Sequence, residues 1–434
     1  MVGSLGNEGV AAPNNLGHYS VDGRVPEAAV FPSGIDDVSQ LLAFASDAGK
    51  VVVPRGGGTQ MALGNIPPRV DLVVGLARLN RLLFHEPGDL VAGVEAGISL
   101  NTLQSELALQ GQFLPLEGPL PDRATVGGIL AANATGPSRL AYGSPRDWLI
   151  GIKVVHSDGT VTKSGGRVVK NVTGYDLNKL YTGSLGTLGV IVEATFKLAP
   201  APAERVTLVA TYPSVATALA SAGGLLRQRA TPQALHVIDR QVTGRLPGLV
   251  PEVNQATVLA LLSGRKVAVK RRADDCAIAL DRGGAKTVGT LSSKDSAPLW
   301  QAITDLGWTE EMPPSLVAKV GILPSQMGEF VEASLELDRP GVVADVGSGL
   351  VRLLWWSDEE SSSAEADIQG RLDKLWDVVH SINGHMVIER CPAHIKSVLD
   401  VWGDPPEAID VMRRVKGQLD PAGILNTGRF AGRI

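Results

Sequence analysis

The first clear pattern of hydrophobic and polar positions along the chain has the period of a helix. Its apolar face is formed by Val38, Leu41, Leu42 and Ala45. Asp36 or Asp37 is the expected N-cap of this helix, which we predict to end near Gly49. The apolar run 50–53 then predicts a short buried strand that Pro54 ends.

The remainder of the first two hundred residues predicts mainly strands. They are expected at 70–74, at 90–95 with alternating burial, at 148–156, at 160–163 and at 188–198. Ser99 is the expected cap of a helix that Gly111 stops. Ser157-Asp158-Gly159 is typical of a hairpin turn.

After Pro200-Ala201-Pro202 the pattern changes to a repeated order of strands and helices. Strands are predicted at 205–212, 233–238, 257–262, 316–323, 342–346, 350–356 and 385–389, and helices at 215–229, 266–280, 326–337 and 364–382. Two successive halves of β-α-β-β-α-β type favour an α+β domain with an antiparallel sheet, in which ferredoxin-like halves are duplicated.

A chain of 434 residues is too long for one ordinary core, so we expect more than one domain. Residues 1–25 are polar and without period, which indicates a loose N-terminal lead-in. We predict a first domain over 26–200 and an α+β cap or substrate domain over 201–405. The C-terminal segment 406–434 is expected to return to the first domain.

Charge and cysteine content exclude several classes of protein. A formal net charge of -5 gives no electrostatic footprint for nucleic acid. Cys276 and Cys391 lie far apart, which supports neither a disulfide framework nor a zinc or iron–sulfur site. No signal peptide or membrane-spanning apolar run is evident, and we expect a cytoplasmic protein.

Two glycine-rich loops carry the candidate binding chemistry. The first is Arg55-Gly56-Gly57-Gly58-Thr59, and the second, Thr125-Val126-Gly127-Gly128, opens a run of helix formers. Backbone N–H groups at such loops and helix starts can bind a pyrophosphate. A turn between strands is the alternative for the first loop, although three successive glycines exceed what one turn needs. Neither a Rossmann fingerprint nor a Walker loop occurs, so a nicotinamide dinucleotide is not favoured.

These loops and several further motifs resemble the two-loop FAD signature of the vanillyl-alcohol-oxidase-like (PCMH-type) flavoproteins. The motifs are Pro54-Arg55-Gly56-Gly57-Gly58-Thr59, Asp122-Arg123-Ala124-Thr125-Val126-Gly127-Gly128, Asn133, Tyr142-Gly143, Arg146-Asp147, Asn171-Val172-Thr173-Gly174-Tyr175-Asp176-Leu177, Gly183-Ser184-Leu185-Gly186-Thr187-Leu188-Gly189-Val190-Ile191 and Leu419-Asp420-Pro421-Ala422-Gly423-Ile424-Leu425-Asn426-Thr427-Gly428-Arg429. The resemblance implies a PCMH-type two-lobed FAD-binding domain. It also implies the cofactor-binding residues Arg55, Gly56, Gly57, Gly58, Thr59, Gln60, Asp122, Thr125, Gly127, Gly128, Gly143 and Ile191.

The same resemblance bears on how FAD is held. Family members that attach flavin covalently often use a histidine in the first loop and sometimes a cysteine before the second. Gly58 and Arg123 stand at those positions in this chain, and neither can form such a bond. We therefore expect non-covalent, dissociable FAD.

The catalytic residues are less clearly marked than the cofactor loops. His385 is the candidate general base, Arg352 could bind a carboxylate, and Tyr175 could hydrogen-bond flavin or substrate. A structural histidine, a surface salt bridge and core packing are the respective alternatives. No metal site is expected, because His380, His385 and His394 lack suitable ligand spacing and a companion carboxylate cluster.

Within the family, the chain looks most like the smaller FAD-binding subunit of bacterial glycolate oxidase. This implies oxidation of a 2-hydroxy acid such as glycolate to a 2-oxo acid, by hydride transfer to flavin. A larger sister flavoprotein and an iron–sulfur subunit would be the partners, and could bring peripheral membrane association. A self-sufficient FAD oxidase or dehydrogenase of another alcohol and a non-catalytic flavin-holding assembly subunit remain open alternatives.

Overall fold

The computed structural model describes residues 9–168, 174–227, 231–249, 256–309, 311, 313–356 and 368–434. The chain forms two compact units. The first comprises Met1–Thr135, Ser144–Ala201 and Lys396–Ile434, and the second comprises Gly136–Gly143 and Pro202–Ile395. Part of the motif 171–177, namely 171–173, lies outside the described residues, as do 228–229 and 364–367 of two predicted helices.

The first unit begins with a small parallel sheet and the predicted amphipathic helix. The sheet has the order β1-β3-β2, with β1 at Ala28–Val30, β2 at Val52–Arg55 and β3 at Leu72–Gly75. Helix α2, Ile35–Asp47, buries the four apolar residues that the sequence pattern predicts. They pack in one core with side chains of this sheet and of the C-terminal segment.

Two local details of this region differ from the prediction. Gly34, and not Asp36 or Asp37, is the N-cap of α2, because the Asp37 carboxylate accepts hydrogen bonds from the N–H and hydroxyl of Ser33 instead. Strand β2 also runs through Pro54 rather than ending before it. Proline is tolerated there because β2 is an edge strand of this sheet, where no ladder N–H is required at that position.

A five-stranded antiparallel sheet forms the second part of this unit. Its order is β4-β5-β9-β7-β8, with β4 at Leu82–Glu86, β5 at Val91–Glu95, β7 at Leu149–Val155, β8 at Val161–Gly165 and β9 at Val190–Lys197. The predicted turn joins β7 to β8, and Gly159 there has a φ of 84°. All five residues of β5 are buried, so the alternation predicted for it is wrong: Phe84 covers Gly93, and Arg81 covers Glu95.

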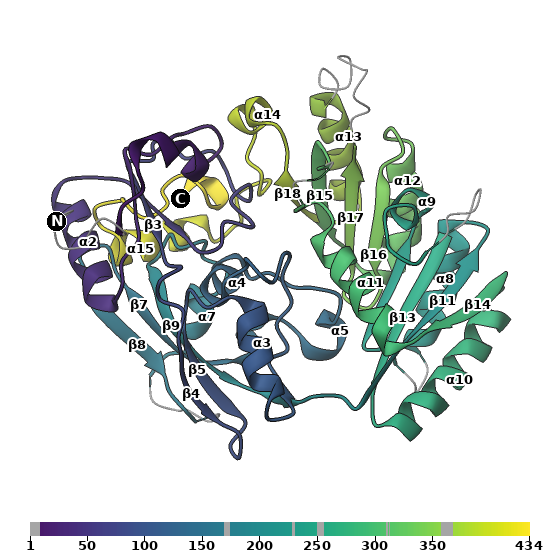
Figure 1. Cartoon of the computed structure of the whole chain (residues 1–434). Helices are drawn as coiled ribbons and strands as arrows, with labels where there is room; N and C mark the ends of the chain where they lie inside the picture. Colours follow the sequence, from purple (N-terminus) through teal and green to yellow (C-terminus); the bar gives the residue numbers. More distant parts are fainter. Residues whose placement is uncertain are drawn as a thin grey trace. The chain divides into compact units, whose positions relative to one another are not determined.

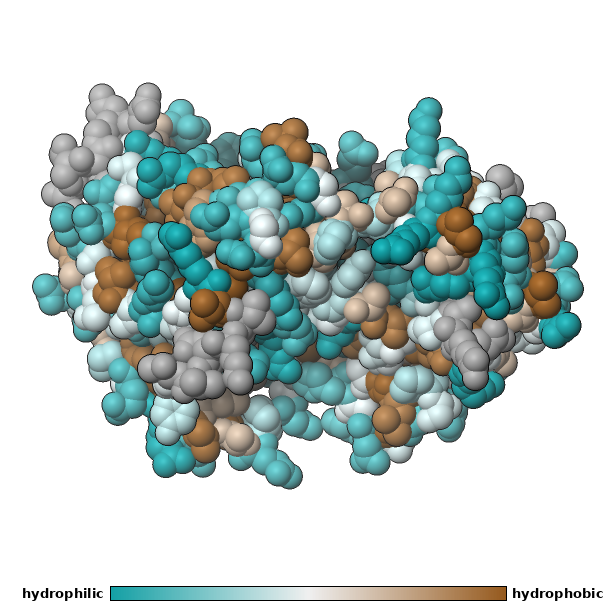
Figure 2. All heavy atoms as spheres, turned by 90° about the horizontal axis from the view of Figure 1, so that it is seen from below, coloured by the Kyte–Doolittle hydropathy of each residue, from teal (hydrophilic) through white to brown (hydrophobic). Residues whose placement is uncertain are grey.

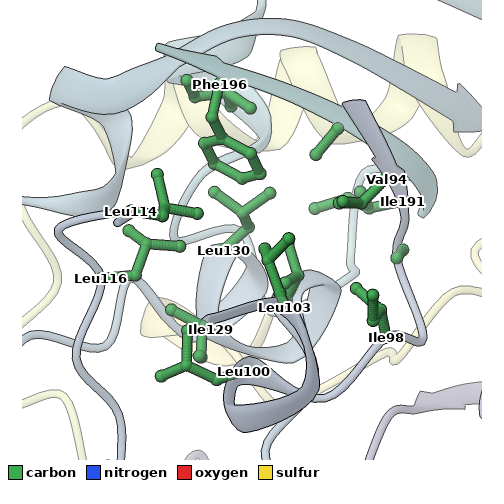
Figure 3. Close-up of a cluster of buried hydrophobic side chains, with 14 of the residues drawn as sticks. Val94, Ile98, Leu100, Leu103, Leu114, Leu116, Ile129, Leu130, Ile191 and Phe196 are labelled. Atoms are coloured by element: carbon green, nitrogen blue, oxygen red, sulfur yellow. The ribbon is translucent and has the colours of Figure 1, made fainter. Parts of the chain in front are cut away.

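One face of this sheet packs against two helices around an aliphatic core (Figure 3). The helices are α3, Leu100–Ala108, and α4, Val126–Ala132. Ser99 caps α3 as predicted, since its side chain accepts a hydrogen bond from the Thr102 N–H. Thr125 caps α4 in the same way through Gly128, at 3.3 Å. This core therefore fixes the start of α4, where the second glycine loop lies.

The C-terminal segment belongs to the same unit and lies beside the parallel sheet (Figure 1). Its helix α15, Ile409–Leu419, leads to a stretch in which Leu425 bridges Val52 of β2. Lys416 donates hydrogen bonds to the Asp420 carboxylate and to the carbonyls of Thr187 and Leu425. These contacts bring residues 425–429 next to the loop that follows β2.

The second unit contains an eight-stranded antiparallel sheet of order β14-β11-β13-β12-β16-β17-β15-β18. The first half is β11 Glu204–Tyr212, α8 Val215–Leu226, β12 Ala234–Ile238, β13 Ala256–Gly264, α10 Lys266–Arg282 and β14 Thr287–Leu291. The second half is β15 Leu316–Gly321, α12 Met327–Leu335, β16 Gly341–Asp345, β17 Leu350–Trp355, α13 Ile368–Ser381 and β18 His385–Arg390. Both halves have the β-α-β-β-α-β order, and they meet where β12 pairs with β16. This confirms the duplicated α+β architecture.

Helix α11, Ser293–Asp305, connects the two halves; neither this helix nor strand β14 was predicted. The remaining short elements are η2 Pro13–Tyr19, β6 Gln112–Phe113, α5 Arg139–Tyr142, α6 Pro145–Trp148, α7 Asn178–Tyr181, β10 Ala199–Pro200, α9 Arg240–Thr243, η3 Pro324–Gln326, α14 Ala393–Val398 and η4 Ala431–Arg433. Among the described helices, none is both long enough and apolar enough to cross a bilayer. The face in Figure 2 carries mostly hydrophilic side chains, with hydrophobic ones scattered among them.

Candidate functional site: a cleft in the first unit

A cleft in the first unit lies between the two predicted glycine loops and the C-terminal segment. The loop after β2 supplies Gly56 to Met61, and α4 supplies its other wall from Thr125 to Ala132. The lining is completed by Pro54, Leu63, Leu185, Asn426 and Arg429. The cleft encloses about 570 Å³ of empty space, its open side included.

Two of the three glycines of the first loop are required by the second loop. A Cβ on Gly56 would lie 2.0 Å from the hydroxyl of Thr125, and one on Gly57 would lie 1.6 Å from the carbonyl oxygen of Arg123. Gly58 has a φ of 72°, in the left-handed region that favours glycine. Gly56 and Gly57 therefore let the two loops interlock, and Gly58 provides the left-handed backbone beside Arg55, which explains the number of glycines without a ligand.

The two loops differ in the hydrogen-bond donors that they leave for a ligand. The N–H groups of Val126 and Gly127 donate to the carbonyls of Ile98 and Ala96, so the start of α4 has little left to offer. In contrast, the backbone N–H groups of residues 56–60 have no acceptor among the described residues. An anion in this cleft would accordingly be held by the first loop, because successive free N–H groups form an anion-binding concavity.

Arg429 supplies a positive charge at the same cleft. The residue is only 2% exposed, and its guanidinium donates to the carbonyls of Met61 and Leu63. Its Nε and one terminal nitrogen have no hydrogen-bond partner in the described part of the chain, nor has the side-chain oxygen of the adjacent Asn426. Burial lowers the pKa of Arg429, but a guanidinium remains protonated at neutral pH. A buried cation with unused donors favours an anionic ligand.

Only some of the predicted cofactor residues line the cleft. Seven of the twelve line the cleft: Gly56, Gly57, Gly58, Thr59, Gln60, Thr125 and Gly128. Arg55 instead places its guanidinium 5.1 Å from the centre of the Tyr19 ring, and burial lowers its pKa. Asp122 is exposed and accepts a hydrogen bond from Asn101.

The other three predicted cofactor residues do not line the cleft either. Gly127 packs on Ala96, where a Cβ would lie 2.8 Å from that residue's own Cβ. The side chain of Ile191 lies in the aliphatic core of Figure 3 and is 4% exposed. Gly143 belongs to the second unit. Asn426 and Arg429 belong to the C-terminal motif of the resemblance, but the sequence does not predict them as site residues.

Two of the catalytic candidates share a face of the eight-stranded sheet. Arg352 on β17 pairs with Lys319 of β15, and His385 on β18 pairs with Gly321 of β15. Usual strand spacing and rise place the Cα atoms of Arg352 and His385 roughly 12 Å apart. Burial, followed by the charge of Lys319, lowers the pKa of His385 below its ordinary value. A neutral imidazole at neutral pH can accept a proton.

Arg352 is already engaged within the second unit. Its Nε donates to the Glu389 carboxylate at 3.1 Å, and a terminal nitrogen donates to the Leu306 carbonyl at 2.7 Å. Glu389 also forms an ion pair with Lys319 at 2.8 Å. Burial opposes ionisation of Glu389, but the two cations and their hydrogen bonds lower its pKa to about 2. Arg352 therefore has only part of its guanidinium left for a substrate carboxylate.

The third catalytic candidate, Tyr175, lies at the surface, whereas His236, which the sequence analysis does not single out, is buried. Tyr175 is 92% exposed, so it does not pack in a core. His236 on β12 faces Asp345 of β16 and has no partner for either ring nitrogen among the described residues. Burial lowers the pKa of His236, which is only 5% exposed and closed to solvent. In the described ranges, no cluster of metal-ligating side chains occurs.

Comparison with known proteins agrees with a flavin-binding architecture. A family model for an FAD binding domain matches residues 26–165. A second, for the C-terminal domain of FAD linked oxidases, matches residues 201–388 and 401–430, half of the chain. The protein is thus an FAD-dependent oxidoreductase. The chain belongs to the FAD linked oxidases.

Several relatives match nearly the whole chain. The glycolate oxidase subunit GlcD of Bacillus subtilis is 25% identical, over 94% of this chain and 89% of its own length. A D-2-hydroxyglutarate dehydrogenase of Xanthomonas citri pv. viticola is 27% identical, over 96% and 93%. A D-lactate dehydrogenase of Archaeoglobus fulgidus is 27% identical, over 93% and 91%.

Solved structures confirm the fold. p-Cresol methylhydroxylase superimposes with a TM-score of 0.76 over 99% of this chain and 95% of its own, at 16% identity. Alkyldihydroxyacetonephosphate synthase gives a TM-score of 0.72 over 93% and 76%, at 18% identity. The predicted PCMH-type fold is confirmed by these matches.

Proposed function

We propose that this protein oxidises a 2-hydroxy acid to the 2-oxo acid with FAD, and that glycolate is the substrate. The cleft carries the cofactor part of the proposal, because its free loop N–H groups and the buried Arg429 suit a dinucleotide diphosphate. The relatives support the substrate part: those cited above are named for glycolate, D-lactate and D-2-hydroxyglutarate.

When bound, FAD supplies the hydride acceptor, and the protein supplies binding, orientation and proton handling. In the proposed seat, the N–H groups of residues 56–60 and the Arg429 guanidinium would hold the diphosphate. Thr59 and Gln60 line the same cleft, and neither side chain has a hydrogen-bond partner among the described residues. Their side chains are accordingly the ones we assign to the remaining polar atoms of the cofactor.

The second unit would supply the groups that act on the substrate. We assign His385 as the base that takes the hydroxyl proton, since its lowered pKa keeps the imidazole neutral at neutral pH. Arg352 would pair with the substrate carboxylate through the part of its guanidinium that Glu389 and Leu306 leave free.

We also propose that this protein works with partner subunits. The glycolate oxidase relative is itself named as a subunit. This chain has only two cysteines, both buried, and cannot hold an iron–sulfur cluster of its own. We therefore propose a sister flavoprotein and an iron–sulfur subunit as the route by which electrons leave the flavin.

Steady-state turnover tests this proposal, with glycolate or D-lactate as substrate and an artificial electron acceptor. The lone chain is compared with the chain co-expressed with its neighbouring gene products. We expect faster turnover in the complex, and loss of activity with FAD retained in His385→Ala. A general base is worth about 10²–10⁴-fold in rate. Unchanged activity in His385→Ala would remove this residue from the mechanism, and equal rates in both preparations would rule out dependence on partners.

A further inference from the structure

Two buried cations hold the stretch 61–64, which follows the glycine loop of the FAD cleft. Arg429 donates to the first and third carbonyls of this stretch. Lys396 of α14 is fully buried and donates to the second and fourth, those of Ala62 and Gly64, at 2.5 and 3.3 Å. The two cations therefore take alternate carbonyls of one short segment, and both belong to the first unit with it.

The Asp22 carboxylate pairs with only one of these two cations. One of its oxygens accepts a hydrogen bond from the Lys396 ammonium at 2.8 Å. Its other oxygen is buried and has no partner in the described part of the chain. Asp22 stands in a turn closed by backbone hydrogen bonds between Val21 and Arg24, with a φ of 46°, in the left-handed region that aspartate tolerates. The turn therefore fixes the carboxylate, and half of it is unused.

Arg429 lies within electrostatic reach of the same carboxylate but does not bond to it. Burial lowers the pKa of Arg429, and the negative charge of Asp22 opposes that shift. The Nε and one terminal nitrogen of Arg429 have no acceptor among the described residues. A buried carboxylate that loses its cation is costly, so it pairs with another donor within reach. Asp22 and Arg429 thus hold the complementary unused atoms of an ion pair, and Lys396 is the cation that Asp22 uses instead.

We propose that Lys396 is a positioning residue for FAD, which holds the Asp22 carboxylate so that the Arg429 guanidinium stays free for the diphosphate. The inference rests on the FAD seat proposed above. Lys396 does not line the cleft, so it acts there only through other residues. Without its ammonium, a charge-assisted pair between Asp22 and Arg429 would compete with the ligand. The stretch 61–64 would also lose two of the bonds that fix its carbonyls.

A double-mutant cycle on the full chain tests this role, with FAD dissociation constants taken from flavin fluorescence titration of the apoprotein. Lys396→Met should weaken FAD binding at least about tenfold, because Asp22 then takes the free donors of Arg429. Asp22→Asn alone should bind FAD at least as tightly as the wild type, since Arg429 loses no donor. Adding Asp22→Asn to Lys396→Met should tighten FAD binding at least about threefold over Lys396→Met alone, because no carboxylate is left to compete. A purely structural ion pair predicts no such recovery.

Lys50→Met is the matched control. Lys50 is a lysine of the same unit with a carboxylate partner, Glu27 at 2.7 Å, and it does not line the cleft. Its replacement should leave FAD affinity unchanged. Thermal melts of the FAD-free variants measure folding separately from binding.

A folded Lys396→Met variant with wild-type affinity, or a double variant that binds no more tightly than Lys396→Met, would overturn the role of Lys396. If Lys396→Met does not fold, Asp22→Asn decides: weaker FAD binding by this folded variant than by the wild type would overturn the role. Arg429→Met separates this outcome from failure of the FAD seat. Loss of affinity in Arg429→Met with none in Lys396→Met removes only the role of Lys396, whereas wild-type affinity in Arg429→Met removes the seat.

Discussion

Replacing Arg429 with methionine should weaken FAD binding about 10- to 150-fold. The guanidinium has two nitrogens without partners in the described structure, and it borders the cleft. Hydrogen bonds to charged groups contribute about 1.5–3 kcal/mol, and each 1.4 kcal/mol changes a dissociation constant tenfold. Methionine keeps much of the side-chain volume, so the lost donors and charge dominate the effect.

The same substitution also removes the bonds to the Met61 and Leu63 carbonyls, so folding and binding must be measured separately. Flavin fluorescence titration of the apoprotein gives the dissociation constant, and thermal melts without FAD give the folding contribution. Arg433→Met is the matched control: this exposed arginine, four residues later, donates to the Leu399 carbonyl and does not line the cleft. It should leave FAD affinity unchanged. A folded Arg429→Met variant with wild-type affinity would refute our assignment of the C-terminal segment to the FAD seat.

Three further predictions concern the cofactor bond, the loops and acid stability. Because neither Gly58 nor Arg123 can attach flavin, acid precipitation should leave the yellow colour in the supernatant; flavin fluorescence on the denatured band would contradict this. Gly57→Ala should lower thermal stability and FAD content together, since its Cβ would lie 1.6 Å from the Arg123 carbonyl oxygen, whereas Gly88→Ala, with nothing within 4 Å, should change neither. Wild-type stability in Gly57→Ala would show that the loops do not interlock. The pKa of Glu389 falls from 4.5 to about 2 on folding, so its contribution of up to about 3 kcal/mol is present above pH 4.5 and is lost as the pH falls toward 2. Chemical denaturation from pH 6 to pH 3 should show a shallower loss of stability in Glu389→Gln than in the wild type, and identical slopes would count against the Lys319–Glu389–Arg352 network.

Regular periodicity was enough to predict much of the fold. The four buried positions of α2 follow directly from helical spacing, and the order of apolar segments predicts the second β-α-β-β-α-β half and the first half without its last strand. Strand β14 was missed because only Val288 and Leu291 are partly buried and the rest is exposed, which leaves no apolar run. Helix α11 was missed because Pro298 lies inside it and interrupts the helical pattern.

Some parts of the proposed cofactor cleft can be predicted from local sequence, whereas others depend on contacts between distant segments of the chain. The two glycine loops are local features, and the sequence alone marks them as a diphosphate site. Arg429 reaches the cleft only because Leu425 bridges Val52, more than three hundred residues earlier in the chain. The sequence also gives no sign that the Val126 and Gly127 N–H groups are used by the carbonyls of Ile98 and Ala96. Contacts of that kind depend on tertiary packing.

Anaerobic flavin bleaching tests the proposed activity most directly. The FAD-loaded chain is mixed without oxygen with glycolate, D-lactate, D-2-hydroxyglutarate and, as a control, a primary alcohol that lacks the carboxylate. Our account predicts loss of the oxidised flavin absorbance with a 2-hydroxy acid and its return when oxygen or an acceptor is admitted. Full retention of the oxidised spectrum with every 2-hydroxy acid, in both the lone chain and the complex, would contradict it.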